Sequence, residues 1–300
     1  MKKFSIYVLL SLLFFACNSR QEEIEDEVNK PVENEEKIPA SFTQKILIEH
    51  ASRVSAGMSM QGQEYISVYK EQYQDRIIPV SIHYNEFEVK QVTDYFDETY
   101  EFYKCVPMGF VNRMQSNFHR NLGLYVSLPP HDWASVIDSL EKRDKTSSGI
   151  ALQTTYNQEN KVVNVTAKIA TNNKFDITGK YKLIIYLTED EVIYPQNNIY
   201  SGDDFYIRHA FGEKYYYLPP VINDFSHNAL LRNVFTSGEG DDIEIPKTGI
   251  VTEKSYSINL TNEKYQNCNV VAALLKQDRN GIFQVENAQI AKLGENQAWD

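Results

Sequence analysis

Cys17 is the residue whose surroundings in the sequence are most informative about its chemistry. It follows a thirteen-residue apolar run, Phe4 to Ala16, which begins directly after Lys2 and Lys3. This pattern is typical of a secretory signal, and the run is too short for a bilayer, which takes about 20 residues to cross. A cysteine directly after the run predicts lipoprotein maturation, with cleavage before Cys17 and acyl chains on that residue. The alternative is an ordinary cleaved signal beside a chance cysteine.

A mature chain that begins at Cys17 retains two further thiols, Cys105 and Cys268. They lie far apart in the sequence, and the pattern of elements given below places them in different domains. An oxidising envelope would allow a disulfide between them, but we expect two separate buried cysteines. A lone Cys105 thiol could form a mixed disulfide with a partner, so a redox role for Cys105 stays open as the alternative.

No other group of side chains has the spacing of a catalytic or metal site. Glu49 and His50 end one expected strand, and His83 ends another. They lack a short-range ligand spacing such as His-x-x-x-His, and neighbouring residues of a strand point to opposite faces. Ser59 lies outside the Gly-x-Ser-x-Gly context of a hydrolase nucleophile. We therefore expect no metal, no cofactor, no catalytic residue and no enzymatic activity.

Three consecutive tyrosines, Tyr215, Tyr216 and Tyr217, precede a pair of prolines. In an exposed loop, clustered tyrosines suit recognition of a protein or glycan ligand, because each offers a rigid ring surface and a hydroxyl group for hydrogen bonding. The alternative is a strand that places alternate tyrosines in the core. Both interpretations stay open, and the three residues are candidates for ligand binding.

The order of apolar patterns predicts an α/β domain over residues 44–145. Short buried runs indicate strands, and apolar residues at helical spacing indicate helices. The two kinds of segment alternate, which is typical of helices layered on a sheet. The expected strands cover 45–49, 76–83, 108–113 and 122–126, and the expected helices cover 58–74, 89–103 and 132–142.

Residues 146–300 are expected to form an all-β domain. Apolar and polar residues alternate with period two, and turn residues separate the alternating segments. Strands of this kind suggest an antiparallel β-sandwich. The clearest ones are expected at 163–169, 181–187, 256–260, 270–275 and 282–290.

The charge of the chain is strongly acidic near its start. Residues 1–16 are the expected signal peptide, and residues 17–43 are the expected stalk, whose many acidic and few apolar residues predict an extended, disordered segment. The formal net charge is −11, and it becomes −13 when Lys2 and Lys3 leave with the signal. No stripe of basic residues exists, so we expect no nucleic-acid partner.

The first half resembles a thioredoxin-like domain in the order of its elements. Val106-Pro107, directly before an expected strand, fits the position of that fold's cis-proline. Thioredoxin-like domains carry Cys-x-x-Cys after the first strand, whereas this chain reads Ala56-Gly57-Met58-Ser59-Met60-Gln61-Gly62. Ala56 and Ser59 stand where the two cysteines belong, and neither side chain can form a disulfide. The resemblance therefore implies a redox motif that is degenerate.

Five blocks of sequence spread over most of the chain carry a wider resemblance. They are Ile46–Glu49, Arg76–His83, Val106–Arg113, Leu183–Asp190 with Gln196, and His227–Arg232. In this order the blocks resemble the outer-membrane-protein-28-related family, whose members are lipoproteins of Bacteroidota. The resemblance implies a thioredoxin-like N-terminal domain followed by an antiparallel β-sandwich, tethered at the outer membrane, in a family without a well-defined enzymatic role. We expect a cell-surface lipoprotein that binds, adheres or assists envelope assembly; the alternative is a thiol-redox protein or chaperone that uses Cys105.

Overall fold

The computed structural model describes residues 37–100, 106–114, 127–142, 145–260 and 263–300. Residues 38–300 form one compact unit. The expected signal and most of the expected stalk lie outside the described residues, and so do Cys17, Cys105 and the strand expected at 122–126.

The first part of the unit alternates strands and helices, as the apolar patterns predict. Strands β2 and β3 are parallel, and β4 runs antiparallel to β2 on its other side. All seven residues of β2 and all seven of β3 are buried, as expected for strands covered on both faces. The Val106–Pro107 peptide bond before β4 is cis, the isomer expected from the sequence. The elements are β2 (Ile46–Ser52), α1 (Met60–Tyr73), β3 (Ile77–His83), α2 (Lys90–Tyr100), β4 (Met108–Val111) and α3 (Trp133–Glu141).

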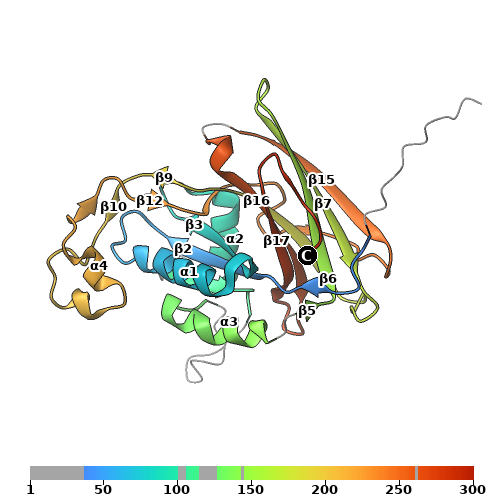
Figure 1. Cartoon of the computed structure of the whole chain (residues 1–300), viewed down its shortest axis with the longest axis horizontal. Helices are drawn as coiled ribbons and strands as arrows, with labels where there is room; N and C mark the ends of the chain where they lie inside the picture. The colour runs from blue at the N-terminus through green and yellow to red at the C-terminus, as the bar shows by residue number, and fades with distance from the viewer. Residues whose placement is uncertain (1–36, 101–105, 115–126, 143–144, 261–262) are drawn as a thin grey trace, which may run out of the picture. The chain divides into compact units, whose positions relative to one another are not determined.

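One mixed sheet joins the two halves of the chain (Figure 1). Its strand order is β17-β16-β8-β13-β3-β2-β4, with β14 added beside β8. The boundary predicted at residue 146 therefore does not separate two sheets, because β13 from the second half pairs with β3 from the first. The strands from the second half are β8 (Tyr181–Glu189), β13 (Leu230–Val234), β14 (Asp241–Asp242), β16 (Cys268–Gln277) and β17 (Phe283–Lys292).

A second, four-stranded antiparallel sheet packs against the mixed sheet. Its order is β15-β7-β6-β18. Along β7, Val163, Val165 and Ala167 face the core and their neighbours face solvent, which is the period-two pattern of the sequence. Two packed sheets are thus present, but one of them is a mixed sheet shared with the first half, so residues 146–300 do not form the separate antiparallel sandwich that the sequence predicts. The strands are β6 (Ser148–Asn157), β7 (Val162–Thr171), β15 (Val251–Asn259) and β18 (Asn296–Gln297).

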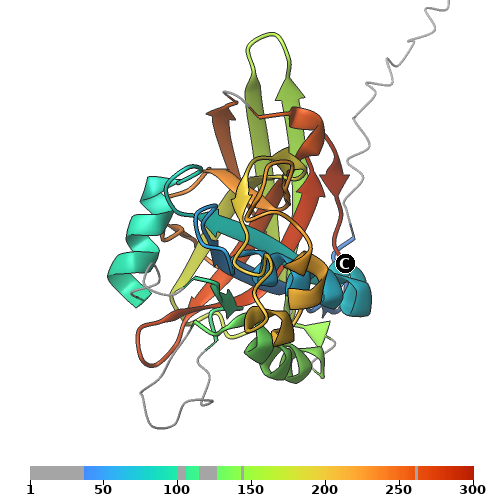
Figure 2. The same ribbon diagram turned by 90° about the vertical axis from the view of Figure 1, so that its left-hand side faces the viewer.

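The helices cover both faces of the mixed sheet. Ile46 and Ile48 of β2 pack with residues of α1 and α3. Leu47, between them, points to the opposite face and packs with α2 through Val92 and Phe96. Figure 2 shows α2 separated from α1 and α3 by the strands.

Residues 190–229 leave the mixed sheet at the end of β8 and return to it at β13, and we call them the excursion. It extends past the N-terminal end of α1 (Figure 1). It contains β9 (Val192–Ile193), β10 (Gln196–Asn197), α4 (Gly212–Tyr216), β11 (Val221–Ile222) and β12 (Ser226–His227). A further short pair is β1 (Phe42–Thr43) with β5 (Lys145–Thr146).

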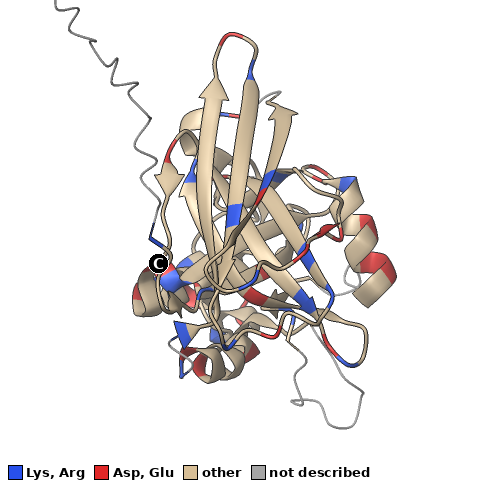
Figure 3. Cartoon of the chain, turned by 90° about the vertical axis from the view of Figure 1, so that its right-hand side faces the viewer, with Lys and Arg blue, Asp and Glu red and all other residues tan. Residues whose placement is uncertain are grey.

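Acidic and basic side chains are mixed on the surface. Figure 3 shows blue and red segments interspersed along the strands and loops of that view. Within the described residues, no helix is long and apolar enough to cross a membrane.

Candidate functional site

The excursion covers the loop that precedes α1. The side-chain amide of Gln196 donates to the carbonyl oxygens of Val54 at 3.1 Å and Ala56 at 3.0 Å. The backbone N–H of Asn197 donates to the Val54 carbonyl at 2.8 Å. A Cβ atom at Gly57 would lie 2.6 Å from the backbone nitrogen of Ile199, so the two segments approach as closely as a glycine allows. The excursion therefore covers the loop at the start of α1, and we call residues 54–59 the sealed loop.

Ala56 and Ser59 occupy this sealed loop. Ser59 is buried, and its hydroxyl oxygen accepts the backbone N–H of Arg53 at 3.1 Å. Met60, the first residue of α1, packs in a small core with Tyr200 of the excursion. Ser59 and Ala56 thus both take part in local hydrogen bonds, Ser59 through its hydroxyl and Ala56 through its backbone carbonyl.

The three consecutive tyrosines do not share one surface. Tyr215 and Tyr216 end the short helix α4 and Tyr217 directly follows it, so successive side chains point in different directions. Tyr215 is buried and donates to Glu64, Tyr216 donates to Asp204 at 2.8 Å, and Tyr217 is 83% exposed. Tyr215 is therefore unavailable to a ligand, which corrects that part of the prediction. The strand with alternate tyrosines, its alternative, is absent at this position.

Glu49 and His50 point to opposite faces of β2, as their adjacency predicts. His50 lies against the edge of Trp133, with ring centroids 5.9 Å apart, and burial lowers the pKa of its imidazole to about 3. His83 stacks edge-on against His227 at 5.2 Å, and burial, followed by the nearby histidines, lowers the pKa of His83. These imidazoles are neutral at pH 7. Within the described ranges, no group of three or more His, Cys, Asp or Glu side chains could hold a metal ion.

Glu49 forms a buried ion pair that the spacing of charged residues in the sequence does not predict. Arg113 donates from Nε to Oε2 of Glu49 at 2.7 Å and from Nη2 to Oε1 at 2.6 Å. The hydroxyl of Tyr186 donates to Oε1 at 2.7 Å. Burial opposes the guanidinium charge, but Glu49 beside it holds the pKa of Arg113 well above its ordinary value. Left-handed backbone at Asn112 and Arg113, with φ of 50° and 51°, turns the chain inward at this point.

Cys268 lies on β16 in the sandwich core. It is a free thiol with 0% exposure, and burial raises its pKa to about 12. Since the thiolate is the reactive form, Cys268 is inert at neutral pH.

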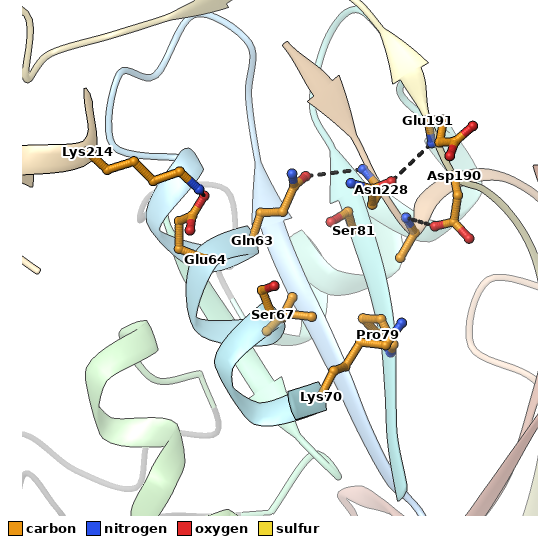
Figure 4. Close-up of a pocket in the computed structure, with 12 residues that line it drawn as sticks. Gln63, Glu64, Ser67, Lys70, Pro79, Ser81, Asp190, Glu191, Lys214 and Asn228 are labelled. Carbon is orange, nitrogen blue, oxygen red and sulfur yellow. Dashed lines mark hydrogen bonds and ion pairs between the residues drawn. The ribbon is translucent and has the colours of Figure 1, made fainter. Parts of the chain in front are cut away.

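A pocket of about 470 Å³ opens beside the sealed loop, between α1 and the ends of β8 and β13. Its volume lies in the range of small-molecule sites. Its lining is mostly polar and comes from segments far apart in the sequence, so no local sequence motif predicts the pocket. Figure 4 shows the lining residues Gln63, Glu64, Ile66, Ser67, Lys70, Pro79, Ser81, Asp190, Glu191, Lys214, Asn228 and Ala229.

The model of the outer membrane protein Omp28 family matches residues 93–297 of this chain. The chain belongs to the Omp28 outer membrane protein family. The matched region includes most of α2, the excursion, the whole second sheet and the strands of the mixed sheet other than β2 and β3. Membership places this Omp28 family protein at the outer membrane. No curated protein sequence matches the chain.

A solved structure from another bacterium resembles this Omp28 family protein in fold. HBP35 of Porphyromonas gingivalis superposes with a TM-score of 0.64 at 16% identity, and the match covers 87% of this chain and 78% of that one. A structural-genomics protein from Agrobacterium tumefaciens gives a TM-score of 0.47 at 11% identity, over 84% of this chain and 96% of that one. The likeness to HBP35 shows a shared fold.

Proposed function

We propose that this chain is a lipid-tethered protein of the outer membrane surface that binds a protein or glycan ligand without chemical turnover. One observation carries the proposal: Gln196 and its neighbours seal the loop at the start of α1, where Ala56 and Ser59 replace cysteines. The open pocket lies directly beside that seal and is polar. A binding role therefore suits this face of the molecule better than thiol exchange does.

The scaffold of the first half is, on this proposal, thioredoxin-like. Parallel β2 and β3, antiparallel β4 beside β2, and the intervening helices support this assignment. In such scaffolds the first thiol is activated at the N-terminus of the helix after the first strand. That helix is α1 here, and its start holds no cysteine.

We expect the full-length protein to be inactive in an insulin-reduction assay with dithiothreitol. Ala56 and Ser59 cannot exchange disulfides, and the Cys268 thiol is protonated and buried. The measurement is the rate of insulin precipitation against a protein-free blank, with thioredoxin as the positive control. A Cys105→Ser variant tests the alternative: turnover by the parent that disappears in this variant would replace the proposal with a redox function.

We expect Cys17→Ser to move the protein from the membrane fraction to the soluble fraction. Each buried CH₂ of an acyl chain contributes about 0.8 kcal/mol, and more than one chain gives stable anchoring. Fractionation of cells and incorporation of an alkyne-labelled palmitate measure the tether, with Asn18→Ser as the matched control. Protease added to intact cells then measures surface exposure. Retention of the serine variant in the membrane would contradict lipid tethering through Cys17.

A further inference from the structure

The pocket beside α1 has two walls of different origin (Figure 4). Gln63, Ser67 and Lys70 lie on one side of α1, because residues four and three positions apart share a face of a helix. The opposite wall includes Glu191, which directly follows the residue after β8, and Asn228, which precedes β13. In Figure 4, Lys70 lies at the bottom of the group of side chains drawn, and Glu191 lies at its upper right.

Most charged side chains of the pocket already have partners within the protein. The ammonium group of Lys214 pairs with Glu64 at 2.6 Å. Asp190 accepts the backbone N–H of Ala229 at 2.7 Å and the amide of Asn269 at 2.9 Å. These contacts hold the walls of the pocket in place.

Two charges of opposite sign are left for a ligand. The Lys70 ammonium forms no hydrogen bond or ion pair with the part of the chain that the structure describes, and its side chain is exposed. Glu191 is exposed, and its carboxylate accepts one long hydrogen bond, from the Asn267 amide at 3.4 Å. A ligand with a negative end near Lys70 and a positive end near Glu191 would meet both.

The open edge of β3 adds a backbone acceptor between these charges. β3 pairs with β2 at seven positions, but among the described residues it pairs with β13 at Ser81 alone. Pro79, two residues earlier, directs its carbonyl oxygen to the same edge as Ser81. Pro79 has no N–H, so this edge cannot build a full ladder with an added strand. The edge therefore suits one short extended ligand.

We propose that this pocket binds a short peptide with free termini, its carboxylate at Lys70 and its ammonium at Glu191. The assignment rests on the proposed binding role and names its ligand class. The side-chain amide of Gln63 accepts the backbone N–H of Asn228 and donates to the Ser226 carbonyl. The side-chain oxygen of Asn228 accepts the backbone N–H of Glu191, so both side-chain amides are fixed in the wall. The Ser67 hydroxyl and the Pro79 carbonyl are placed to meet backbone groups of the peptide. A neutral saccharide would leave both charges uncompensated.

Calorimetric titration of the full-length protein with trialanine tests the inference. Acetylation of the amino end and amidation of the carboxyl end should each weaken binding by about fivefold, the effect of one partly exposed ion pair. In Glu191→Gln, acetylation should have no further effect, and in Lys70→Gln, amidation should have none. The matched controls are Glu159→Gln and Lys174→Gln, which change exposed charges outside the pocket.

Three results would each overturn the assignment. The first is equal affinity for the free and capped peptides in the parent protein. The second is the absence of trialanine binding at millimolar concentration, and the third is capping effects that persist in both charge variants. None of these results depends on the insulin-reduction assay, so failure of the peptide site is distinguishable from failure of the non-enzymatic role.

Discussion

Glu49→Gln is expected to lower the free energy of unfolding by about 3–5 kcal/mol, the usual cost of breaking a buried ion pair by removing one partner. Glu49 and Arg113 are both completely buried. After the substitution, the guanidinium group stays in the core without a counter-charge. The aromatic rings of Tyr95 and Phe96 beside it, 5.7 Å and 4.9 Å from its central carbon, cannot replace the carboxylate. Urea denaturation followed by circular dichroism measures the loss.

Two controls separate the missing charge from general disturbance of the core. The double variant Glu49→Met/Arg113→Met removes both charges at similar volume, and we expect it to be more stable than Glu49→Gln. Lys90→Gln breaks an exposed pair with Asp94, and about 0.5 kcal/mol or less should be lost. A loss below about 1 kcal/mol for Glu49→Gln would contradict a structural role of the pair, because a net hydrogen bond alone is worth that much.

Trp133→Ala is expected to cost about 3–5 kcal/mol, as truncation of a buried tryptophan does elsewhere. The indole of Trp133 has 0% exposure and joins α3 to the sheet. Its Nε1–H donates to the carbonyl of Leu128 at 2.8 Å. A Cβ atom at Gly109 of β4 would lie 2.5 Å from the ring, so the strand and the indole are in direct contact. Alanine would leave a cavity between α3 and β4.

Trp133→Phe is the matched control for this truncation. Phenylalanine retains an aromatic ring but loses the hydrogen bond to the Leu128 carbonyl, which contributes about 1 kcal/mol to the free energy of unfolding. Thermal and urea unfolding of both variants provides the comparison. If alanine and phenylalanine cost the same, the packing of the indole between α3 and β4 does not contribute as the structure implies.

Helices and strands that are indicated by a pattern of neighbouring residues could be predicted from the sequence with nearly correct bounds. The expected helix at 58–74 corresponds to α1 at Met60–Tyr73, and the strand expected at 76–83 corresponds to β3 at Ile77–His83. Their apolar residues recur with the period of the element that they form, and this pattern depends on neighbours along the chain. The period-two segments of the second sheet are predictable for the same reason.

The features that depend on distant partners could not be predicted. Gln196 seals a loop 140 residues before it, and Arg113 meets Glu49 across 64 residues. β13 is five residues long, and its pairing with β3 joins two regions that look like separate domains. The residues next to an isolated Gln, Arg or short apolar run in the sequence do not indicate its distant partner. The site beside α1 could therefore be located only from the structure.

The sheet that joins both halves also sets when this protein can fold. Asn287 of β17 accepts the backbone N–H of Lys45 across 242 residues, and the N–H of Val285 donates to the carbonyl of Asn112. During synthesis, the first strands therefore leave the ribosome long before their last partner exists. Contacts of such high sequence separation slow folding. The complete mixed sheet can therefore form only after β17, its last strand in the sequence, has been synthesised.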